Sequence, residues 1–315
     1  MARALVTGAG GFIGTALVDA LARRGDAVAA LDLRSSPRLD ALVERHANLA
    51  FVQGDVCEWP QLAQAIKAHR PEAVIHLAAI VGVINSLASP LATMRVNIEG
   101  SLNLMEAMRL LEVPRLINLS TEEVYGPFTA PRIDESHPCR PRQPYGISKY
   151  AVEQLGRDFA HNHGMEVVHL RTCWVYGPGL PRPRVPKILI DAAVAGRRLH
   201  LAAGGDFRVD HVYIDDLVDG ILKALDKPEH AFDVYHIATG EAPSLLEIVA
   251  ILQELEPAVD LAVGPGEYAF ADGVEAVRKG ALDIARARAE LGYTPRHPIR
   301  AGLQAYLAWR RHHPL

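Results

Sequence analysis

The sequence is poor in cysteine, which excludes one common way of stabilising a fold. Its three cysteines, Cys57, Cys139 and Cys173, lie far apart and form no Cys-x-x-Cys pair. A disulfide framework or a cysteine-based metal site needs closely spaced cysteines, usually in even number. We therefore expect neither, and the low cysteine content favours the reducing cytoplasm.

Long apolar stretches are also absent. No run of about 18 apolar residues occurs, which is the least that a membrane-spanning helix needs. The chain opens directly on the strand-like Ala4-Leu5-Val6 instead of a charged and then apolar leader. These features predict a cytoplasmic protein with no membrane partner.

An excess of basic residues is lacking as well. The 315 residues include 33 Lys and Arg against 37 Asp and Glu, a formal net charge of −4. Nucleic-acid-binding domains usually carry a basic surplus, so we expect no nucleic-acid partner. The 49% of hydrophobic and 22% of charged residues are typical of a globular protein and exclude a disordered one.

Short apolar runs alternate with amphipathic stretches through the first half of the chain. The apolar runs predict strands at Ala4–Thr7, Ala27–Leu31, Leu49–Gln53, Ala73–Leu77, Arg115–Leu119 and Val167–Arg171. The stretches between them predict helices at Phe12–Arg24, Gln61–His69, Leu91–Leu111 and Tyr145–His163. Strands that are apolar on both faces and alternate with helices are typical of a doubly wound parallel sheet, so we predict an α/β fold.

The alternation of apolar and amphipathic stretches ends after Tyr176. The segment Gly177–Pro186 is too rich in proline and glycine for a regular element. Beyond it we expect a strand near Val209–Ile214, a helix at Asp215–Leu225 and a strand near Val234–Ile237, all returning to the sheet edge. Further helices are predicted near Ser244–Glu256, Ile284–Leu291 and Ile299–Trp309. The predicted first domain is therefore 1–175, rejoined by 205–240, and the smaller region is 176–204 and 241–315.

Three glycines follow the first predicted strand and open the first predicted helix. Gly8, Gly11 and Gly14 have the spacing GxxGxxG. Such glycines let the backbone approach a pyrophosphate, whose charge is met by the N–H groups of a helix N-terminus. A tight turn alone would also explain glycine here. The strand–turn–helix context favours a dinucleotide site.

Acidic residues end the second and third predicted strands. Asp32 stands where a carboxylate accepts hydrogen bonds from a ribose 2′-hydroxyl, which favours NAD over NADP. Arg34 is either a surface arginine or a residue that tolerates a 2′-phosphate. Asp55 either meets the adenine amine or serves as a turn acid. The sequence leaves both alternatives open.

A tyrosine and a lysine stand four residues apart at the start of a predicted helix. This spacing places Tyr145 and Lys149 on one helix face, and Pro144 is a suitable first residue. A phenol has a pKa of about 10, and an ammonium about 4 Å away favours the phenolate by about 4 kcal/mol. The pair therefore fits general acid–base chemistry. Its alternative is an ordinary helix surface.

Polar residues follow the fifth predicted strand, at the sheet edge where open α/β sheets bind ligands. Ser120 or Thr121 offers a hydroxyl to a substrate beside Tyr145. Glu122 and Glu123 offer an acid or base for a carbon-bound proton. The alternative for both glutamates is a pair of solvated loop acids.

The chain resembles the extended short-chain dehydrogenase/reductase family, in its NAD-dependent epimerase/dehydratase branch, over nearly its whole length. The motifs are TGAGGFIG at Thr7–Gly14, LD at Leu31-Asp32, GDV at Gly54–Val56, HLAA at His76–Ala79, VNIEG at Val96–Gly100, STEEVYG at Ser120–Gly126, YGISK at Tyr145–Lys149 and VYGPG at Val175–Gly179. The resemblance implies a Rossmann fold with a smaller C-terminal substrate-binding region.

The resemblance also implies roles for individual residues. Tyr145 would be the catalytic base, Lys149 its electrostatic and ribose-binding partner, and Thr121 the hydroxyl member. NAD would contact Gly8, Gly11, Phe12, Ile13, Gly14, Asp32, Arg34, Asp55, Val56, Leu77, Ala78, Ala79, Asn97, Tyr145 and Lys149. Helices containing Met94–Met108 and Tyr145–His163 would form a homodimer contact.

The implied reaction is oxidation at a sugar carbon, followed by epimerisation or elimination from the keto sugar. Thr121-Glu122-Glu123 resembles the corresponding residues of nucleotide-sugar 4,6-dehydratases, and Glu123 also matches the glutamate of UDP-glucuronate decarboxylases. Nucleotide-sugar relatives commonly carry an asparagine and an arginine at the positions of Trp174 and Val209, where the asparagine contacts the diphosphate. These departures favour the alternative, an NAD-dependent dehydrogenase of a free sugar or sugar acid. A non-catalytic sensor is a third possibility, which the intact Tyr145 and Lys149 disfavour.

Two pairs of neighbouring histidines raise the question of a metal. His161 and His163 stand close together, as do His312 and His313. No carboxylate or cysteine pattern completes either pair, and His-x-His at a helix end more often faces solvent. We predict no metal site.

Overall fold

The computed structural model describes residues 2–271 and 273–313, and the chain forms two compact units. Unit 1 comprises Met1–Tyr125, Cys139–Arg171 and Val218–Tyr235, and unit 2 comprises Gly126–Pro138, Thr172–Leu217 and His236–Leu315. Relative to the predicted division, residues 126–138, 172–175, 205–217 and 236–240 group with unit 2.

A seven-stranded sheet forms the centre of unit 1, in the order β11-β7-β5-β4-β1-β2-β3. The pairs β1–β2, β1–β4, β2–β3 and β4–β5 are all parallel. The strands in chain order are β1 (Arg3–Thr7), β2 (Ala27–Asp32), β3 (Leu49–Gln53), β4 (Ala73–His76), β5 (Arg115–Thr121), β7 (Glu166–Thr172) and β11 (Val234–Ile237). The order reverses between β1 and β4, so the predicted doubly wound fold is confirmed.

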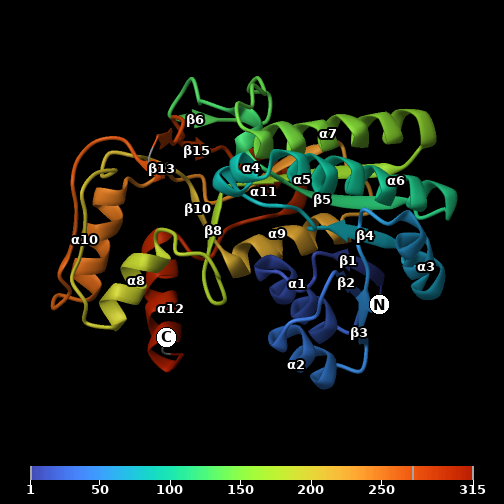
Figure 1. The fold of residues 1–315 in the computed structure, drawn as a ribbon, viewed down its shortest axis with the longest axis horizontal. Coiled ribbons are helices and arrows are strands. Elements are labelled where there is room, and N and C mark those ends of the chain that lie inside the picture. Colours follow the sequence, from blue (N-terminus) through green and yellow to red (C-terminus); the bar gives the residue numbers. More distant parts are fainter. Residues whose placement is uncertain (1, 272, 314–315) are drawn as a thin grey trace. The chain divides into compact units, whose positions relative to one another are not determined.

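Helices cover both faces of this sheet. Figure 1 shows α6 and α7 on one side of the strands and α1 and α9 on the other. The helical elements are α1 (Phe12–Arg23), α2 (Pro37–Arg45), α3 (Trp59–His69), α4 (Val83–Ala88), α5 (Pro90–Met94), the π-helical turn η1 (Arg95–Glu99), α6 (Gly100–Leu110), the 3₁₀ turn η2 (Glu122–Tyr125), α7 (Pro144–His163) and α9 (Ile214–Asp226).

One predicted helix is continuous but contains a π turn that was not predicted. The stretch Leu91–Leu111 is divided into α5, η1 and α6, because the backbone widens into a π turn around Asn97. Sequence analysis also missed α2 and α4. The signal for α2 was present, since Ser36 caps the helix by accepting a hydrogen bond from Leu39 N, and Pro37 is its first residue.

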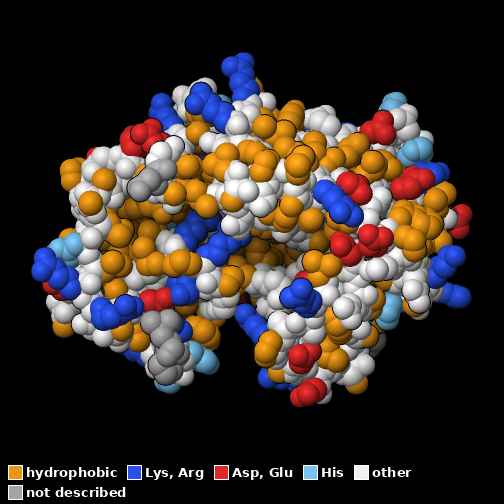
Figure 2. Space-filling view, viewed as in Figure 1, with side chains coloured by type: hydrophobic (Ala, Val, Ile, Leu, Met, Phe, Trp, Pro, Cys, Tyr) orange, Lys and Arg blue, Asp and Glu red, His pale blue; other side chains and the backbone are white. Residues whose placement is uncertain are grey.

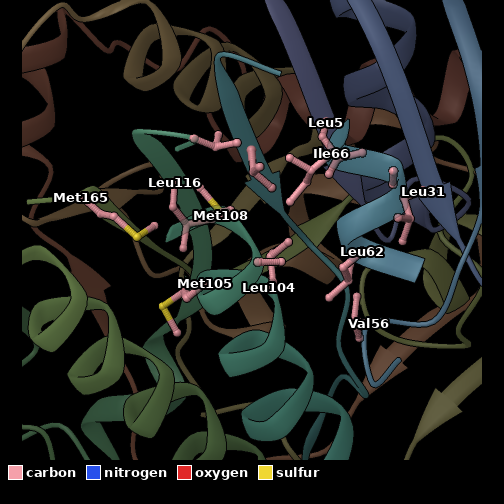
Figure 3. Close-up of a cluster of buried hydrophobic side chains, with 14 of the residues drawn as sticks. Leu5, Leu31, Val56, Leu62, Ile66, Leu104, Met105, Met108, Leu116 and Met165 are labelled. Carbon is pink, nitrogen blue, oxygen red and sulfur yellow. The ribbon is translucent and has the colours of Figure 1, made fainter. Parts of the chain in front are cut away.

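The main core of unit 1 lies between the sheet and the helices α3 and α6. Figure 3 shows Leu5 and Leu31 from the strands facing Leu62 and Leu104 from the helices. Met105 and Met108 are fully buried in the same cluster. Their flexible side chains fill the space between strand and helix layers, so they are core residues.

The described residues of unit 2 form short paired strands and the helices α8, α10, α11 and α12. Its two-stranded sheets are β10–β8, β12–β9, β13–β14 and β15–β6. Its elements are β6 (Arg132–Ile133), β8 (Trp174–Tyr176), α8 (Lys187–Val194), β9 (Leu199–Leu201), β10 (His211–Tyr213), α10 (Leu245–Leu255), β12 (Leu261–Val263), β13 (Ala269–Ala271), β14 (Val274–Glu275), β15 (Ala281–Leu282), α11 (Ala285–Leu291) and α12 (Ile299–His312).

The prediction that the strand near Val209–Ile214 returns to the main sheet is wrong. This strand is β10, and it pairs with β8 in unit 2, while β11 takes the edge position of the main sheet. The buried carboxylate of Asp210 explains the difference. It accepts hydrogen bonds from the backbone N–H groups of Thr239 at 3.0 Å and Gly240 at 2.9 Å, and so fixes β10 beside the loop that follows β11.

The hydropathy of the helices and the distribution of surface charge bear on possible partners. None of the helices in residues 2–271 and 273–313 is long and apolar enough to cross a membrane. On the face shown in Figure 2, acidic and basic side chains are interspersed over unit 1 and over unit 2.

Candidate active site

The glycine loop after β1 lies directly against the backbone that follows β4. Gly8 has a φ of +69°, a conformation that suits glycine. A Cβ atom on Gly8 would lie 2.7 Å from Ala78 N and 2.8 Å from the carbonyl carbon of Leu77, and one on Gly14 would overlap the Gly8 oxygen. The loop is therefore closed tightly on the sheet edge, and α1 begins at Phe12 immediately after it.

Asp32 at the end of β2 helps to hold this loop. Its Oδ2 atom accepts a hydrogen bond from Gly10 N at 2.9 Å, and a Cβ atom on Gly10 would come within 3.2 Å of that oxygen. Sequence analysis missed Gly10, although it stands inside the glycine run. Arg34 is exposed, and its backbone oxygen also borders Gly10.

A cavity of about 540 Å³ opens at the ends of β2 and β3. It is lined by Leu33, Gln53, Gly54, Asp55, Glu58 and Gln61. Asp55 Oδ1 accepts a hydrogen bond from Cys57 N at 2.8 Å, so one oxygen of Asp55 orders a turn while the residue lines the cavity. The cavity lies at the carboxyl edge of the parallel sheet, where open α/β sheets bind ligands, on the β2–β3 side of the switch point between β1 and β4.

The tyrosine and lysine of the YGISK motif occupy the first two turns of α7. Tyr145 is 8% exposed and Lys149 is 3% exposed, so the alternative of an ordinary helix surface is wrong. Burial lowers the pKa of Lys149 to about 8, against the opposing effect of Glu153. The ammonium form of Lys149 therefore still predominates at pH 7, as a role beside a phenolate requires.

The segment after β5 packs against the start of α7. Thr121, Glu122 and Glu123 are all buried, so the alternative of solvated loop acids is wrong. A Cβ atom on Gly146 would lie 2.5 Å from the Glu123 backbone oxygen. Glycine next to Tyr145 thus allows the close approach that brings the tyrosine and the two glutamates into one region of unit 1.

Asn97 in the π turn η1 is hydrogen-bonded both to the loop after β4 and to α7. Its Oδ1 accepts a hydrogen bond from Ile80 N at 2.8 Å, and its Nδ2 donates to Ile80 O at 3.1 Å and to Ser148 Oγ at 2.9 Å. The amide therefore positions the loop after β4 against α7. The π turn is the local distortion that aims the side chain there.

His76 is a buried residue of the site that sequence reasoning did not assign, although it begins the HLAA motif. Its Nδ1 lies 2.7 Å from Thr7 Oγ1 and its Nε2 lies 2.8 Å from Ser101 Oγ. Burial, and secondarily the charge of Lys149, lower its pKa to about 3. A neutral His76 thus links β1, β4 and α6 beneath the glycine loop. Nearby, Val56 packs against Gly100 of α6.

A buried ion pair lies directly below the candidate catalytic segment. Arg171 of β7 donates to the Glu153 carboxylate of α7 from Nε at 2.9 Å and from Nη2 at 2.5 Å. Ser120 Oγ donates to Glu153 at 2.6 Å, and Arg171 Nη1 donates to Tyr125 Oη at 2.7 Å. The network ties the end of β5 to the helix that carries Tyr145, and it was not apparent from the sequence.

The chain matches a known protein family and is similar to proteins of known activity. The profile of the NAD-dependent epimerase/dehydratase family matches residues 4–238. A UDP-glucose 4-epimerase of Mycolicibacterium smegmatis is 32% identical over 309 residues, 96% of each chain. A dTDP-glucose 4,6-dehydratase of Streptomyces griseus is 32% identical over 317 residues, covering 98% of this chain and 94% of the relative.

Solved structures are similar over nearly the whole chain. The UDP-glucose 4-epimerase of Thermotoga maritima with UDP-glucose is 31% identical, with a TM-score of 0.87 and coverage of 98% of both chains. MoeE5 in complex with UDP-glucuronic acid and NAD is 30% identical, with a TM-score of 0.85 and coverage of 98% of this chain and 99% of that one.

Proposed function

Since the chain belongs to the NAD-dependent epimerase/dehydratase family, we propose that it oxidises a carbon of a nucleotide sugar and converts the transient keto sugar to an epimerised or dehydrated product. The observation that carries this proposal is the burial of Tyr145 and Lys149 together, on the helix that packs against Thr121-Glu122-Glu123. A role in surface recognition would not require burial of these groups.

The residues of unit 1 fit NAD. Gly8, Gly11 and Gly14 allow the loop to close tightly at the start of α1, whose N-terminal N–H groups would meet the pyrophosphate. Asp32 holds Gly10 of this loop, and Asp55 lines the cavity in which the adenosine part would lie. Bound NAD would accept a hydride from the sugar carbon and return it later. Phe12 and Ile13 begin α1 after the glycine loop, Ala79 follows β4, and Asn97 lies in η1.

We assign the proton transfer to Tyr145. Its phenolic oxygen takes the proton of a sugar hydroxyl, and the nearby ammonium of Lys149 stabilises the phenolate by about 4 kcal/mol if the charges lie about 4 Å apart. The same oxygen returns the proton when the ketone is reduced. Because the pair is buried, water screens the attraction weakly.

Glu122 and Glu123 supply the further acid–base capacity that distinguishes dehydration from simple oxidation. Both residues are buried, and the Glu123 backbone oxygen lies against Gly146 in the first turn of α7. One of them would remove a proton from the carbon next to the ketone, which the ketone makes acidic, and the other would protonate a leaving hydroxyl. Thr121 would donate a hydrogen bond to the sugar.

A second candidate function is favoured by one specific observation in unit 2. Trp174 and Val209 are buried in the same cluster with Phe207, so apolar groups fill positions where a charged contact would suit a diphosphate. This favours an NAD-dependent dehydrogenase of a free sugar or sugar acid.

Incubation of the NAD-loaded protein with UDP- and dTDP-hexoses separates the two functions. We expect a new nucleotide-sugar product by NMR spectroscopy without net NADH at 340 nm, since the hydride returns to the sugar. Steady NADH accumulation with a free sugar or sugar acid would favour the dehydrogenase instead. No turnover of any sugar would contradict both.

We also propose that two copies form a homodimer through α4 to α7. These helices carry the exposed apolar side chains Ile84, Leu87, Leu91, Leu102 and Ile147, with Leu91 86% exposed. Such a patch is typical of a protein–protein interface. Light scattering should give twice the chain mass, and a monomer at micromolar concentration would contradict the proposal.

The three free cysteines favour a cytoplasmic location, which cell fractionation would test.

A further inference from the structure

Five side chains in the interior of unit 1, each at most 2% exposed, form a continuous series of hydrogen bonds. In order along the series they are Thr7, His76, Ser101, Asn97 and Ser148. They come from the ends of β1 and β4, from α6, from the π turn η1 and from α7. The series therefore connects the residue before the glycine loop with the helix that carries Tyr145.

The direction of these hydrogen bonds follows from the groups that can only accept. Ser101 Oγ lies 2.5 Å from the backbone oxygen of Asn97, so Ser101 donates its only hydroxyl proton there. Ser101 Oγ must then accept from His76 Nε2 at 2.8 Å, which makes Nε2 the protonated nitrogen. The other nitrogen, Nδ1, accepts from Thr7 Oγ1 at 2.7 Å, and Thr7 Oγ1 itself accepts from Ala78 N at 3.3 Å. The imidazole is thus held in one tautomer and one orientation.

This arrangement needs a neutral ring, because a protonated imidazole could not accept from Thr7. Burial, and secondarily the charge of Lys149, lower the pKa of His76 to about 3, so the ring is neutral at pH 7. Both ring nitrogens are engaged inside the protein, and His76 is only 1% exposed. The ring therefore acts on other residues of unit 1 and transfers no proton to a substrate.

The far end of the series holds the backbone of Tyr145. Asn97 Nδ2 donates to Ser148 Oγ at 2.9 Å, and Ser148 Oγ donates to the backbone oxygen of Tyr145 at 2.8 Å. The π turn η1 aims the Asn97 amide at Ser148, and the hydroxyl of Ser101 holds a backbone oxygen of that turn. Buried hydrogen bonds that run in one direction strengthen one another, so the loss of one weakens the next. A change at His76 is therefore transmitted to the first turn of α7.

We infer that His76 is a positioning residue for the proposed proton transfer: it holds η1 through Ser101, and so keeps Tyr145 in place relative to the glycine loop. The inference rests on the proposed function, in which Tyr145 takes a proton while NAD lies on that loop. A displacement of about 1 Å in a reacting group can lower a rate by about 100-fold, so a loosened η1 should be visible in kcat. Binding depends less steeply on position, so the affinities for NAD and sugar should change little.

Two amide variants separate the roles of the two ring nitrogens. His76→Gln places an N–H donor near the position of Nε2 and keeps the hydrogen bond to Ser101. His76→Asn reaches only the position of Nδ1, so it keeps the acceptor for Thr7 and loses the contact with Ser101. We expect kcat to fall about 10- to 100-fold in His76→Asn and less than about fivefold in His76→Gln, with KM for the sugar and Kd for NAD within about threefold in both.

Ser101→Ala tests the next hydrogen bond in the series. It removes the same contact from the other side, so it should lower kcat as much as His76→Asn does, and the double variant should be no slower than either single one. Because it removes a single atom, it also keeps the test if His76→Asn does not fold. Ser86→Ala is the matched control, since Ser86 Oγ is fully buried and donates to a backbone oxygen of its own helix, that of Val83 at 2.8 Å, outside the series. It should leave kcat within about twofold.

The outcomes distinguish the positioning role from the proposed function. Parent-like kcat in either His76→Asn or Ser101→Ala would overturn the positioning role. Equal losses in His76→Asn and His76→Gln would overturn it as well, because packing alone would explain them, and so would a rise in KM without a fall in kcat.

If the parent protein turns over no sugar, the proposed function fails, and hydrogen exchange then tests the positioning of Tyr145 by itself. The peptide that covers residues 144–150 should exchange faster in His76→Asn than in His76→Gln. Equal exchange of this peptide in the two variants would show that His76 does not hold the start of α7 through Ser101.

Discussion

Replacement of Tyr145 by phenylalanine is expected to lower kcat by about 100- to 10,000-fold, the range that a general acid–base group contributes. The variant keeps the ring that packs at the start of α7 and removes only the phenolic oxygen. Lys149, with its pKa near 8, carries the charge but offers no base at pH 7. The residual rate should therefore be close to that of a site that binds sugar and NAD without moving the proton.

The control for this variant lies five residues further along the same helix. Tyr150→Phe also removes a phenolic oxygen from α7, at a partly exposed position, and should leave kcat within about twofold. The NAD affinity of Tyr145→Phe, measured by fluorescence titration, should stay close to that of the parent. Parent-like turnover by Tyr145→Phe would remove this residue from the chemistry.

The fold of unit 1 could be predicted because its strands are apolar on both faces. Val234–Ile237, which is buried at all four positions, was predicted with the bounds that the structure has, and so was the partly exposed edge strand Leu49–Gln53. Burial between two helix layers leaves little room for polar residues, so the strand signal is local and strong. The resemblance to the family is confirmed by the family profile, which matches residues 4–238 and so spans the glycine and tyrosine motifs.

The errors arose where distant contacts outweigh the local pattern. The stretch Leu91–Leu111 is helical in composition, but Asn97 must reach both Ile80 and Ser148, and the π turn results. The strand β10 is apolar enough for the main sheet, but Asp210 binds it to the loop at Gly240 instead. Neither partner is close in sequence.

In the candidate site, too, local sequence signals were predictive and contacts between distant residues were not. The spacing of Tyr145 and Lys149 predicted a shared helix face, and their burial is consistent with the roles we propose. The partners of Glu153 could not be predicted, because Ser120 and Arg171 lie on two different strands, and an acid four residues after a lysine is usually a surface ion pair. Only the assembled sheet brings the three groups together.

Replacement of Glu153 by glutamine is therefore expected to destabilise the protein by about 3–5 kcal/mol, because it removes the carboxylate charge that pairs with the buried Arg171 guanidinium. Burial by itself would raise the pKa of Glu153, but the hydrogen bond and charge of Arg171 outweigh it and lower that pKa to about 2. The carboxylate is thus charged in the folded protein at any pH near neutrality. Chemical denaturation of parent and variant at pH 7 measures the difference in the free energy of unfolding.

The pH dependence gives this prediction a second, independent signature. A folded-state pKa of about 2 lies below the unfolded value of about 4.3, so the ion pair contributes its full stability above pH 5 and loses it as the pH falls toward 2. The difference between parent and Glu153→Gln should shrink over that interval. Glu254→Gln is the matched control, since Glu254 pairs with Arg300 on the surface with both side chains more than half exposed, and it should cost at most about 1 kcal/mol. If the two variants lose the same stability at pH 7, the buried pair does not hold β5, β7 and α7 together as the distances indicate.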